Sequence, residues 1–306
     1  MYKKILIPLD GSELAEEIFP YVVQLARRLN LDLVFLHVCT PEERPFNTMH
    51  KAYIERMAER VNGVPLELLK RPDVSIVGKP LHAIGKVVIG HPAKEIINYA
   101  KNTDVDFILM ATHGYSGLRR WVMGSVSEKV IRASNIPVLI TRNMVLNQIP
   151  YDKWLTDTMV VPLDGSELSE WVIPHVKKLA KQQGNENIKV ILLRICETLR
   201  TKTDYPYIDF NEYEDKLTEH CKQLSEKYLR EIKKRLQSAG LDVESSVITG
   251  SPAQEIIEYA RKNPLDLIIM ATRGHSAITH WAFGSVADKI IHGVANPIFL
   301  IRPSKT

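Results

Sequence analysis

The sequence predicts an α/β protein made of two tandem domains, each with a mostly parallel sheet covered by helices on both faces. Three observations lead to this prediction. The segment Pro-Leu-Asp-Gly-Ser-Glu-Leu occurs at residues 8–14 and again at 162–168. After each occurrence, short apolar runs alternate with segments of helical periodicity, an order typical of parallel sheets. The 306 residues are enough for two domains of ordinary size.

Later motifs repeat in the same order. Met-Ala-Thr begins at residue 110 and again at 270, and Gly-Ser-Val begins at residue 124 and again at 284. A repeat of this length is typical of tandem globular domains, because solenoid repeats are far shorter. We therefore expect one domain at 1–143, a linker at 144–157 and a second domain at 158–306.

The first copy opens with an apolar run at 4–9, which predicts a strand buried on both faces. Asp10 follows, and Glu13 lies three residues later, a spacing that favours a capping box. Apolar residues then recur at helical spacing, which predicts a helix over 13–29. A second apolar run predicts a strand over 31–38.

The rest of the first copy continues the alternation. Proline in the first turn marks the start of one helix, as expected for a residue without a backbone N–H group. Residues 40–75 are harder to assign, because breakers interrupt a short helical pattern. The expected elements are helices at 51–60, 92–102 and 125–133, and strands at 86–89, 106–110 and 138–141.

The second copy shows the same order with clearer boundaries. Its main difference is a long helical segment in the middle of the domain. The expected strands are 159–161, 189–194, 243–248, 266–270 and 297–301, and the expected helices are 168–181, 211–238, 252–262 and 285–292.

Composition excludes several classes of protein. A formal net charge of +4 is too small to indicate a nucleic-acid or membrane surface, and no apolar run reaches the roughly 20 residues of a membrane span. The chain starts directly with a strand and shows no cleavable signal, so we expect a cytoplasmic protein. Three cysteines are too few and scattered for a disulfide scaffold or a zinc cage, and Cys39 and Cys196 are expected to be buried free thiols.

The candidate binding segments follow strands, where parallel sheets bind ligands. Gly124 and Ser125 open a helix whose free N–H groups favour a phosphate. The alternative to a phosphate site is that this helix start is only a capping box, from Ser125 to Glu128. In the second copy the same box would run from Ser285 to Asp288. Asp10 and its counterpart Asp164 are either helix caps or acceptors for ribose and adenine. His113 and its counterpart Arg273 are either donors to phosphate or solvated loop residues.

Several catalytic motifs are missing from the sequence. It contains no G-x-x-x-x-G-K-[ST] phosphate loop, no G-x-G-x-x-G after the first strand and no G-x-S-x-G nucleophile elbow. No Ser-His-Asp set recurs in both copies, and no metal-ligand cluster stands out. The sequence therefore indicates binding with little catalytic machinery.

The repeated motifs resemble those of the universal stress protein family. Nucleotide-binding members of that family carry G-x2-G-x9-G-[ST]. Here the pattern runs Ala111-x2-Gly114-x9-Gly124-Ser125 and Ala271-x2-Gly274-x9-Gly284-Ser285. The resemblance covers nearly the whole chain, once in each half, and identifies it as a tandem member.

The resemblance implies a doubly wound, five-stranded sheet of order 3-2-1-4-5 in each domain. It also implies ATP as cofactor, possibly with Mg²⁺, between the Asp-Gly-Ser loop and the glycine motif, with no catalytic residue and slow hydrolysis at most. The residues expected at the nucleotide are Pro8, Asp10, Ser12, Val38, Met110, Ala111, His113, Gly114, Gly124, Ser125, Val126 and Ser127 in the first domain, and Pro162, Asp164, Ser166, Ile195, Met270, Ala271, Arg273, Gly274, Gly284, Ser285 and Val286 in the second.

The sequence departs from the family pattern at the first glycine. Alanine stands there in both copies, at Ala111 and Ala271. An added Cβ atom crowds the nucleotide if the backbone φ angle is positive and is harmless if φ is negative. In addition, Ala287 replaces Ser127, which removes one hydroxyl group from the second site.

The resemblance also implies that the domains pair through their last strands, 138–141 and 297–301, and that two chains form a homodimer. Two functions remain open. One is a stress-response protein that binds ATP or another adenine nucleotide as a sensor or regulator. The other is a protein-interaction module without nucleotide, using segments such as 40–75 and 197–210. Adenylate transfer is a weaker third, because the motifs of such enzymes are missing.

Overall fold

The structure, a computed structural model, describes residues 1–12, 18–64, 80–112, 123–142, 157–184, 188–197, 210–263, 267–274 and 283–303. Within these residues one sheet of 10 strands runs through both halves of the chain, in the order β3-β2-β1-β4-β5-β10-β9-β6-β7-β8. The strands are β1 Lys4–Pro8, β2 Asp32–Cys39, β3 Ala83–Ile89, β4 Phe107–Thr112, β5 Val138–Arg142, β6 Thr158–Pro162, β7 Lys189–Cys196, β8 Asp242–Thr249, β9 Leu267–Ala271 and β10 Ile298–Ile301.

Each half has the strand order 3-2-1-4-5, and all neighbours within a half are parallel. The predicted fold class is therefore confirmed. The halves join where β5 and β10 pair antiparallel, with Phe299 opposite Leu139. Both of these edges are thus paired inside the chain, which removes two exposed strand edges.

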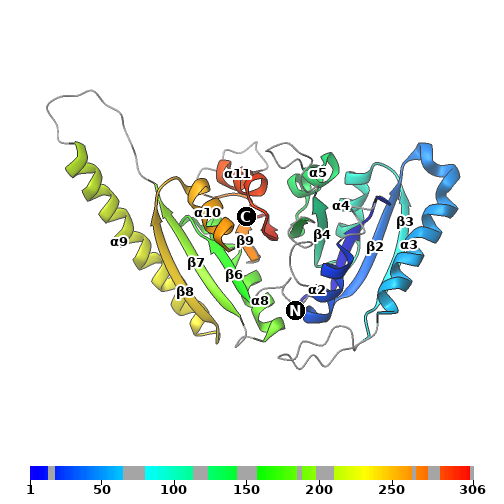
Figure 1. Ribbon diagram of the computed structural model, residues 1–306, viewed down its shortest axis with the longest axis horizontal. Coiled ribbons are helices and arrows are strands. Elements are labelled where there is room, and N and C mark those ends of the chain that lie inside the picture. Colours follow the sequence, from blue (N-terminus) through cyan, green and yellow to red (C-terminus); the bar gives the residue numbers. More distant parts are fainter. Residues whose placement is uncertain are drawn as a thin grey trace.

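Helices cover both faces of the sheet, and Figure 1 shows the two halves side by side, with α9 along one outer flank and α3 along the other. One apolar core lies under α2, α3, α8 and α9, and a second lies under α4, α5, α10 and α11. The helices are α2 Phe19–Leu29, η1 Pro41–Phe46 (3-10), α3 Asn47–Asn62, α4 Pro92–Asn102, α5 Ser125–Ala133, α7 Glu167–Glu170, α8 Ile173–Gln183, α9 Phe210–Gln237, α10 Pro252–Lys262 and α11 Ser285–Gly293.

The strand sequences explain this two-sided burial. Successive residues of a strand point to opposite faces, so Ile5 and Ile7 belong to the first core and Leu6 to the second. All three side chains are fully buried. A strand that is apolar at every position can only lie between two layers of helices, as the sequence predicted.

The first helix of each half differs from its prediction. In the second half, the expected helix 168–181 is two helices, α7 and α8, which separate at Trp171 and Val172. In the first half, α2 begins at Phe19, and residues 13–17 lie outside the described part. A proline at the first turn of α2 and of α8 explains these starts, because proline has no N–H group to bond to a preceding turn.

The cysteine prediction was wrong for one residue. Cys196 forms a disulfide with Cys221, whose Cα atom lies 6.0 Å away on α9. The bond links the end of β7 to the long helix of the second half. Cys39 is a buried free thiol, as expected.

The uncertain segment 40–75 is partly described. It forms the short 3-10 helix η1 and then α3, which runs from Asn47 to Asn62 and is longer than the 51–60 predicted. Residues 65–79 lie outside the described part, as do residues 143–156 of the expected linker.

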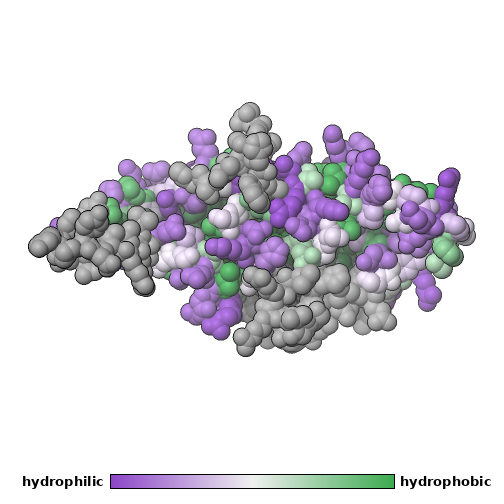
Figure 2. Space-filling model, turned by 90° about the horizontal axis from the view of Figure 1, so that it is seen from above, coloured by the Kyte–Doolittle hydropathy of each residue, from purple (hydrophilic) through white to green (hydrophobic). Residues whose placement is uncertain are grey.

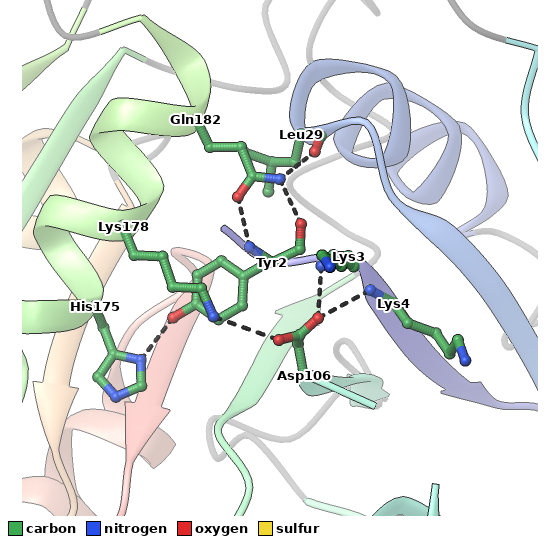
Figure 3. A network of polar contacts seen from close by, with 8 residues as sticks. All are labelled: Tyr2, Lys3, Lys4, Leu29, Asp106, His175, Lys178 and Gln182. Atoms are coloured by element: carbon green, nitrogen blue, oxygen red, sulfur yellow. Dashed lines mark hydrogen bonds and ion pairs between the residues drawn. The ribbon is translucent and has the colours of Figure 1, made fainter. Parts of the chain in front are cut away.

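A polar network also links the halves (Figure 3). The Asp106 carboxylate accepts hydrogen bonds from the backbone N–H groups of Lys3 and Lys4 and lies 3.3 Å from Nζ of Lys178 on α8. Gln182, also on α8, receives a hydrogen bond from the Tyr2 N–H group and donates one to the Tyr2 carbonyl oxygen, at 2.8 and 2.7 Å. The start of the chain is therefore anchored to the second domain.

The surface is mixed in character. Figure 2 shows hydrophilic side chains dispersed among hydrophobic ones over the face seen from above. Within the part of the chain that the structure describes, every helix is too short or too polar to span a bilayer.

Candidate functional site

The strand order creates one crevice in each half. β1 lies between β2 and β4, and β6 lies between β7 and β9. The chain leaves β1 and β4 toward opposite faces of the sheet, and likewise β6 and β9, so the carboxyl ends of each pair border a crevice, the usual ligand site of doubly wound sheets.

In the first half, the predicted residues lie around this crevice where they are described. Pro8 ends β1, Val38 is next to last in β2, and Ala111 is next to last in β4. Gly124 precedes α5, and Ser125, Val126 and Ser127 form its first turn. His113 and Gly114 lie outside the described residues.

In the second half, the crevice contains a cavity of about 400 Å³, within the range of small-molecule sites. Segments that the sequence repeats supply much of its wall. Ser166 and Ser285 are not among the lining residues. The predicted residues that line it are Pro162, Asp164, Ile195, Met270, Ala271, Arg273, Gly274, Gly284 and Val286, and other lining residues include Leu163, Leu193, Ile256, Thr272 and Ala287.

The Asp-Gly-Ser loop has the same conformation in both halves. One carboxylate oxygen of Asp164 accepts hydrogen bonds from the N–H and hydroxyl groups of Ser166, at 2.9 and 2.6 Å. Asp10 does the same with Ser12, at 3.0 and 2.6 Å. The glycine between them has a φ angle of +84° in one loop and +86° in the other, which only glycine adopts without strain.

This loop shows that Asp164 does not cap the following helix. Ser166 is the N-cap of α7, and its hydroxyl oxygen accepts a hydrogen bond from the Ser169 N–H group at 3.1 Å. The Asp164 carboxylate instead reaches across to Gly274, where a Cβ atom would collide with it. With glycine at position 274, the Asp164 carboxylate can lie directly against the backbone of the second repeated segment.

The capping boxes expected at α5 and α11 do not form. The N-cap residues are Gly124 and Gly284, and among the described residues no side chain bonds to either cap position. Glu128 instead pairs with Arg132 at 2.9 Å. The first turn of α11 thus presents backbone N–H groups and the positive end of the helix dipole at the cavity.

Arg273 adds positive charge at the same place. It lines the cavity, and its Nε atom is buried with no hydrogen-bond partner among the residues described. Burial, together with the nearby charge of Arg273, lowers the pKa of Arg302 below its ordinary value. Arg273 and the start of α11 therefore favour an anion next to them, although the carboxylates of Asp164 and Glu197 also line the cavity.

The two alanines that depart from the family pattern lie in strands. Ala111 belongs to β4 and Ala271 to β9. Asn30 is the only residue other than glycine with a positive φ angle in the described part of the chain. Alanine is therefore accommodated at both positions without backbone strain.

One pair of residues at these sites was missed by the sequence reasoning. Thr272 lines the cavity, is 2% exposed, and its hydroxyl oxygen has no partner among the described residues. Thr112, its counterpart at the end of β4, is also 2% exposed, and its hydroxyl oxygen likewise has no partner among the described residues. The repeated Met-Ala-Thr motif contained this signal. The Thr272 carbonyl oxygen also accepts a hydrogen bond from the Gly284 N–H group at 2.9 Å, which positions the start of α11.

Comparison with known proteins gives consistent matches. A family model described as the universal stress protein family matches residues 1–142 and again 156–302. Universal stress protein YxiE of Bacillus subtilis is 31% identical over 148 residues, which cover 46% of this chain and 100% of that protein. Universal stress protein Slr1230 of Synechocystis sp. is 23% identical over 337 residues, covering 98% of this chain and 100% of that protein.

The fold matches over the same length. The crystal structure of a universal stress protein from Archaeoglobus fulgidus has a TM-score of 0.70 and 20% sequence identity, and the match covers 98% of each chain. The tandem arrangement of two such domains is thus shared with a solved structure.

Proposed function

Because the chain belongs to the universal stress protein family, we propose that it is a stress-response protein that binds ATP, or another adenine nucleotide, in the cavity of its second domain. Nucleotide binding there makes the protein a sensor or regulator, with slow hydrolysis or none. The observation that carries the proposal is that the two repeated motifs meet around one cavity of about 400 Å³.

The chemistry of the cavity wall suits the parts of a nucleotide. The uncapped start of α11 and the Arg273 guanidinium group suit the phosphates. The Asp164 carboxylate, on the opposite side of the glycine motif, suits ribose hydroxyl groups as an acceptor. Leu193 and Ile195 supply apolar wall at the end of β7, where an adenine ring finds a surface for packing.

The first domain is proposed as a second, distinct site. Its Asp-Gly-Ser loop and the start of α5 have the geometry of the second domain. It differs in having Ser127, a buried side chain, where the second domain has Ala287. It also has histidine at position 113 where the second has arginine, so we expect the second site to bind phosphates more strongly.

Titration calorimetry with ATP and Mg²⁺ on nucleotide-free protein tests the proposal. The informative variant is Gly284→Ala, because its φ angle of −72° is ordinary and, among the described residues beyond its chain neighbours, the atom nearest to an added Cβ is the Thr272 carbonyl oxygen at 3.8 Å. The fold therefore tolerates the change, whereas a phosphate in contact with this backbone does not. Gly124→Ala, at the equivalent position of the first domain, is the matched control.

We expect one tight binding event per chain, which Gly284→Ala weakens and Gly124→Ala leaves unchanged, and a second, weaker event from the first domain. A second, weaker event that Gly124→Ala removes would show that both domains bind. No binding by the wild-type protein at millimolar ATP would overturn the proposal and favour the protein-interaction module.

A further inference from the structure

A cluster of metal-ligating side chains lies on the first domain, outside the cavity described above. Cys39 ends β2, Glu43 belongs to η1 and His50 to the first turns of α3. One ligand atom from each of these three residues lies within 4.8 Å of the other two. A fourth side chain, His37, stacks its ring on that of His50, with 4.3 Å between ring centroids.

The backbone explains why these residues meet. His37 and Cys39 are two positions apart in β2, so both side chains point to the same face of the sheet. α3 packs on that face, against β2 and β3. The short helix η1 connects β2 to α3, so a single continuous segment of 14 residues, 37–50, supplies the whole cluster.

Two buried nitrogen atoms point to a ligand. Nε2 of His37 and Nε2 of His50 are both buried, and neither has a hydrogen-bond partner within the described residues. His37 is 5% exposed. Buried polar atoms are almost always satisfied, so two such atoms on stacked rings need an explanation. A metal ion that accepts the lone pair of the His50 nitrogen atom, which belongs to the cluster, explains that atom.

A hydrogen bond to the backbone sets the orientation of the His37 ring. Nδ1 of His37 lies 2.9 Å from the carbonyl oxygen of Leu9. A carbonyl oxygen only accepts, so Nδ1 carries the proton and Nε2 of the neutral ring has a free lone pair. This bond fixes the His37 ring, on which the ring of the ligand His50 is stacked, and such outer contacts orient metal-binding histidines.

Glu43 is held in place as well. Its Oε2 atom accepts hydrogen bonds from the N–H and hydroxyl groups of Thr40, at 2.9 and 3.0 Å. The side chain therefore has a fixed direction, with Oε1 as the atom for a ligand. Cys39 contributes a fully buried sulfur atom.

We propose that Cys39, Glu43 and His50 bind a zinc ion with its fourth position open to water, and that His37 is a positioning residue that holds the His50 ring in place. Thiolate, imidazole and carboxylate are the ligands of zinc, and the thiolate disfavours Mg²⁺ and Ca²⁺. Tetrahedral bonds of about 2.0–2.3 Å require ligand atoms about 3.3–3.7 Å apart. The ligand atoms now lie within 4.8 Å of one another, so the three side chains need to move only slightly closer together to bind the ion. One thiolate and one carboxylate neutralise Zn²⁺, so the buried site has no net charge.

The second domain offers an internal comparison. Cys196 occupies the position of Cys39, next to Ile195 as Cys39 is next to Val38, but it is bonded to Cys221. Arg194 takes the position of His37, and its guanidinium group lies over the Tyr228 ring, 5.0 Å from its centroid. The same strand position thus holds a cysteine in both halves, with a disulfide in one and the histidine–glutamate cluster in the other.

The test uses the full chain, stripped with a chelator, reloaded with Zn²⁺ and dialysed. Bound zinc is measured by mass spectrometry of the metal, and affinity by competition with a chromophoric chelator. We expect about one zinc ion per chain, and a blue, tetrahedral spectrum with a thiolate charge-transfer band when Co²⁺ replaces zinc. Zinc content near zero in the reloaded wild-type protein would overturn the proposal.

Variants identify the ligands. We expect Cys39→Ser and His50→Gln to weaken zinc binding by more than about 100-fold, and His37→Gln by about 10- to 100-fold. His91→Gln, at an exposed histidine, is the control and should change nothing. If Cys39→Ser does not fold, Glu43→Gln on the partly exposed η1 takes its place. Equal affinity in the wild type and in the folded ligand variants would place zinc elsewhere and contradict the site.

Discussion

The hydroxyl group of Tyr2 lies 2.6 Å from Nδ1 of His175, although the two residues belong to different halves of the chain. Burial raises the pKa of Tyr2, so the hydroxyl keeps its proton and donates a hydrogen bond to the histidine ring. The Tyr2 ring also packs edge-on against Phe107 and Phe299, one from each half, and Nζ of Lys178 lies over its face. This contact joins the two domains at the start of the chain (Figure 3).

The contact predicts a loss of stability in mild acid. Burial, with the nearby Lys178 charge, lowers the pKa of His175 from 6.5 to about 4. Between these two values the unfolded chain binds a proton that the folded chain excludes, so the free energy of unfolding falls as the pH falls from 6.5 toward 4 and is unaffected above this window. Because the side chain is partly exposed, we expect a loss of about 2 kcal/mol, measured by urea unfolding at several pH values.

His175→Gln isolates this effect, because glutamine does not titrate. We expect the variant to have a flatter dependence of unfolding free energy on pH between 6.5 and 4. His82→Gln, at a side chain that is 68% exposed, should keep the slope of the wild type. An unchanged slope in His175→Gln would show that other groups cause the acid sensitivity.

Removal of the Asp106 carboxylate should loosen the same contact. Asp106→Ala leaves the N–H groups of Lys3 and Lys4 without their acceptor and Lys178 without its partner. We expect a loss of about 2–3 kcal/mol in unfolding free energy. Asp106→Asn keeps an acceptor oxygen but not the charge, so it should cost only about 1 kcal/mol. Equal losses in the two variants would assign the effect to charge alone.

The disulfide should contribute measurably to stability. Cys196 and Cys221 are 25 residues apart in sequence, and closing a loop of this size in the unfolded chain contributes about 3 kcal/mol. We expect Cys221→Ser to lower the thermal midpoint, and a phosphine reductant to lower that of the wild type by a similar amount. The reductant should have no further effect on the variant. A wild-type midpoint that the reductant leaves unchanged would contradict a stabilising disulfide.

Arg273 should matter for phosphates and not for the nucleoside. Arg273→Met keeps most of the apolar stem but removes the guanidinium charge at the cavity. We expect a loss of about 10- to 100-fold in ATP affinity and no change for adenosine. Arg261→Met, at an exposed arginine on α10, is the matched control. Equal losses for ATP and adenosine would show that the change disturbs the cavity itself.

Local signals in the sequence were enough for much of the fold. The helices at Pro92–Asn102, Ser125–Ala133 and Pro252–Lys262 have the predicted bounds. Proline at a first turn and apolar residues at helical spacing act within one element, so they can be recognised without knowledge of its neighbours. The repeat of motifs likewise determined that two similar domains exist, and the apolar runs determined that their strands are buried on both faces.

Tertiary structure decided which side chains meet. Gly274 lies against Asp164, which is 110 residues earlier in the chain, because the parallel strands bring their carboxyl ends together. The disulfide of Cys196 depends on where α9 packs against β7, and the cluster of Cys39, Glu43 and His50 depends on the turn through η1. Sequence periodicity describes the face of a helix or strand on which a residue lies. The distance between two faces is set by the packing of whole helices and strands. Only that packing brings the side chains of these pairs and clusters into contact.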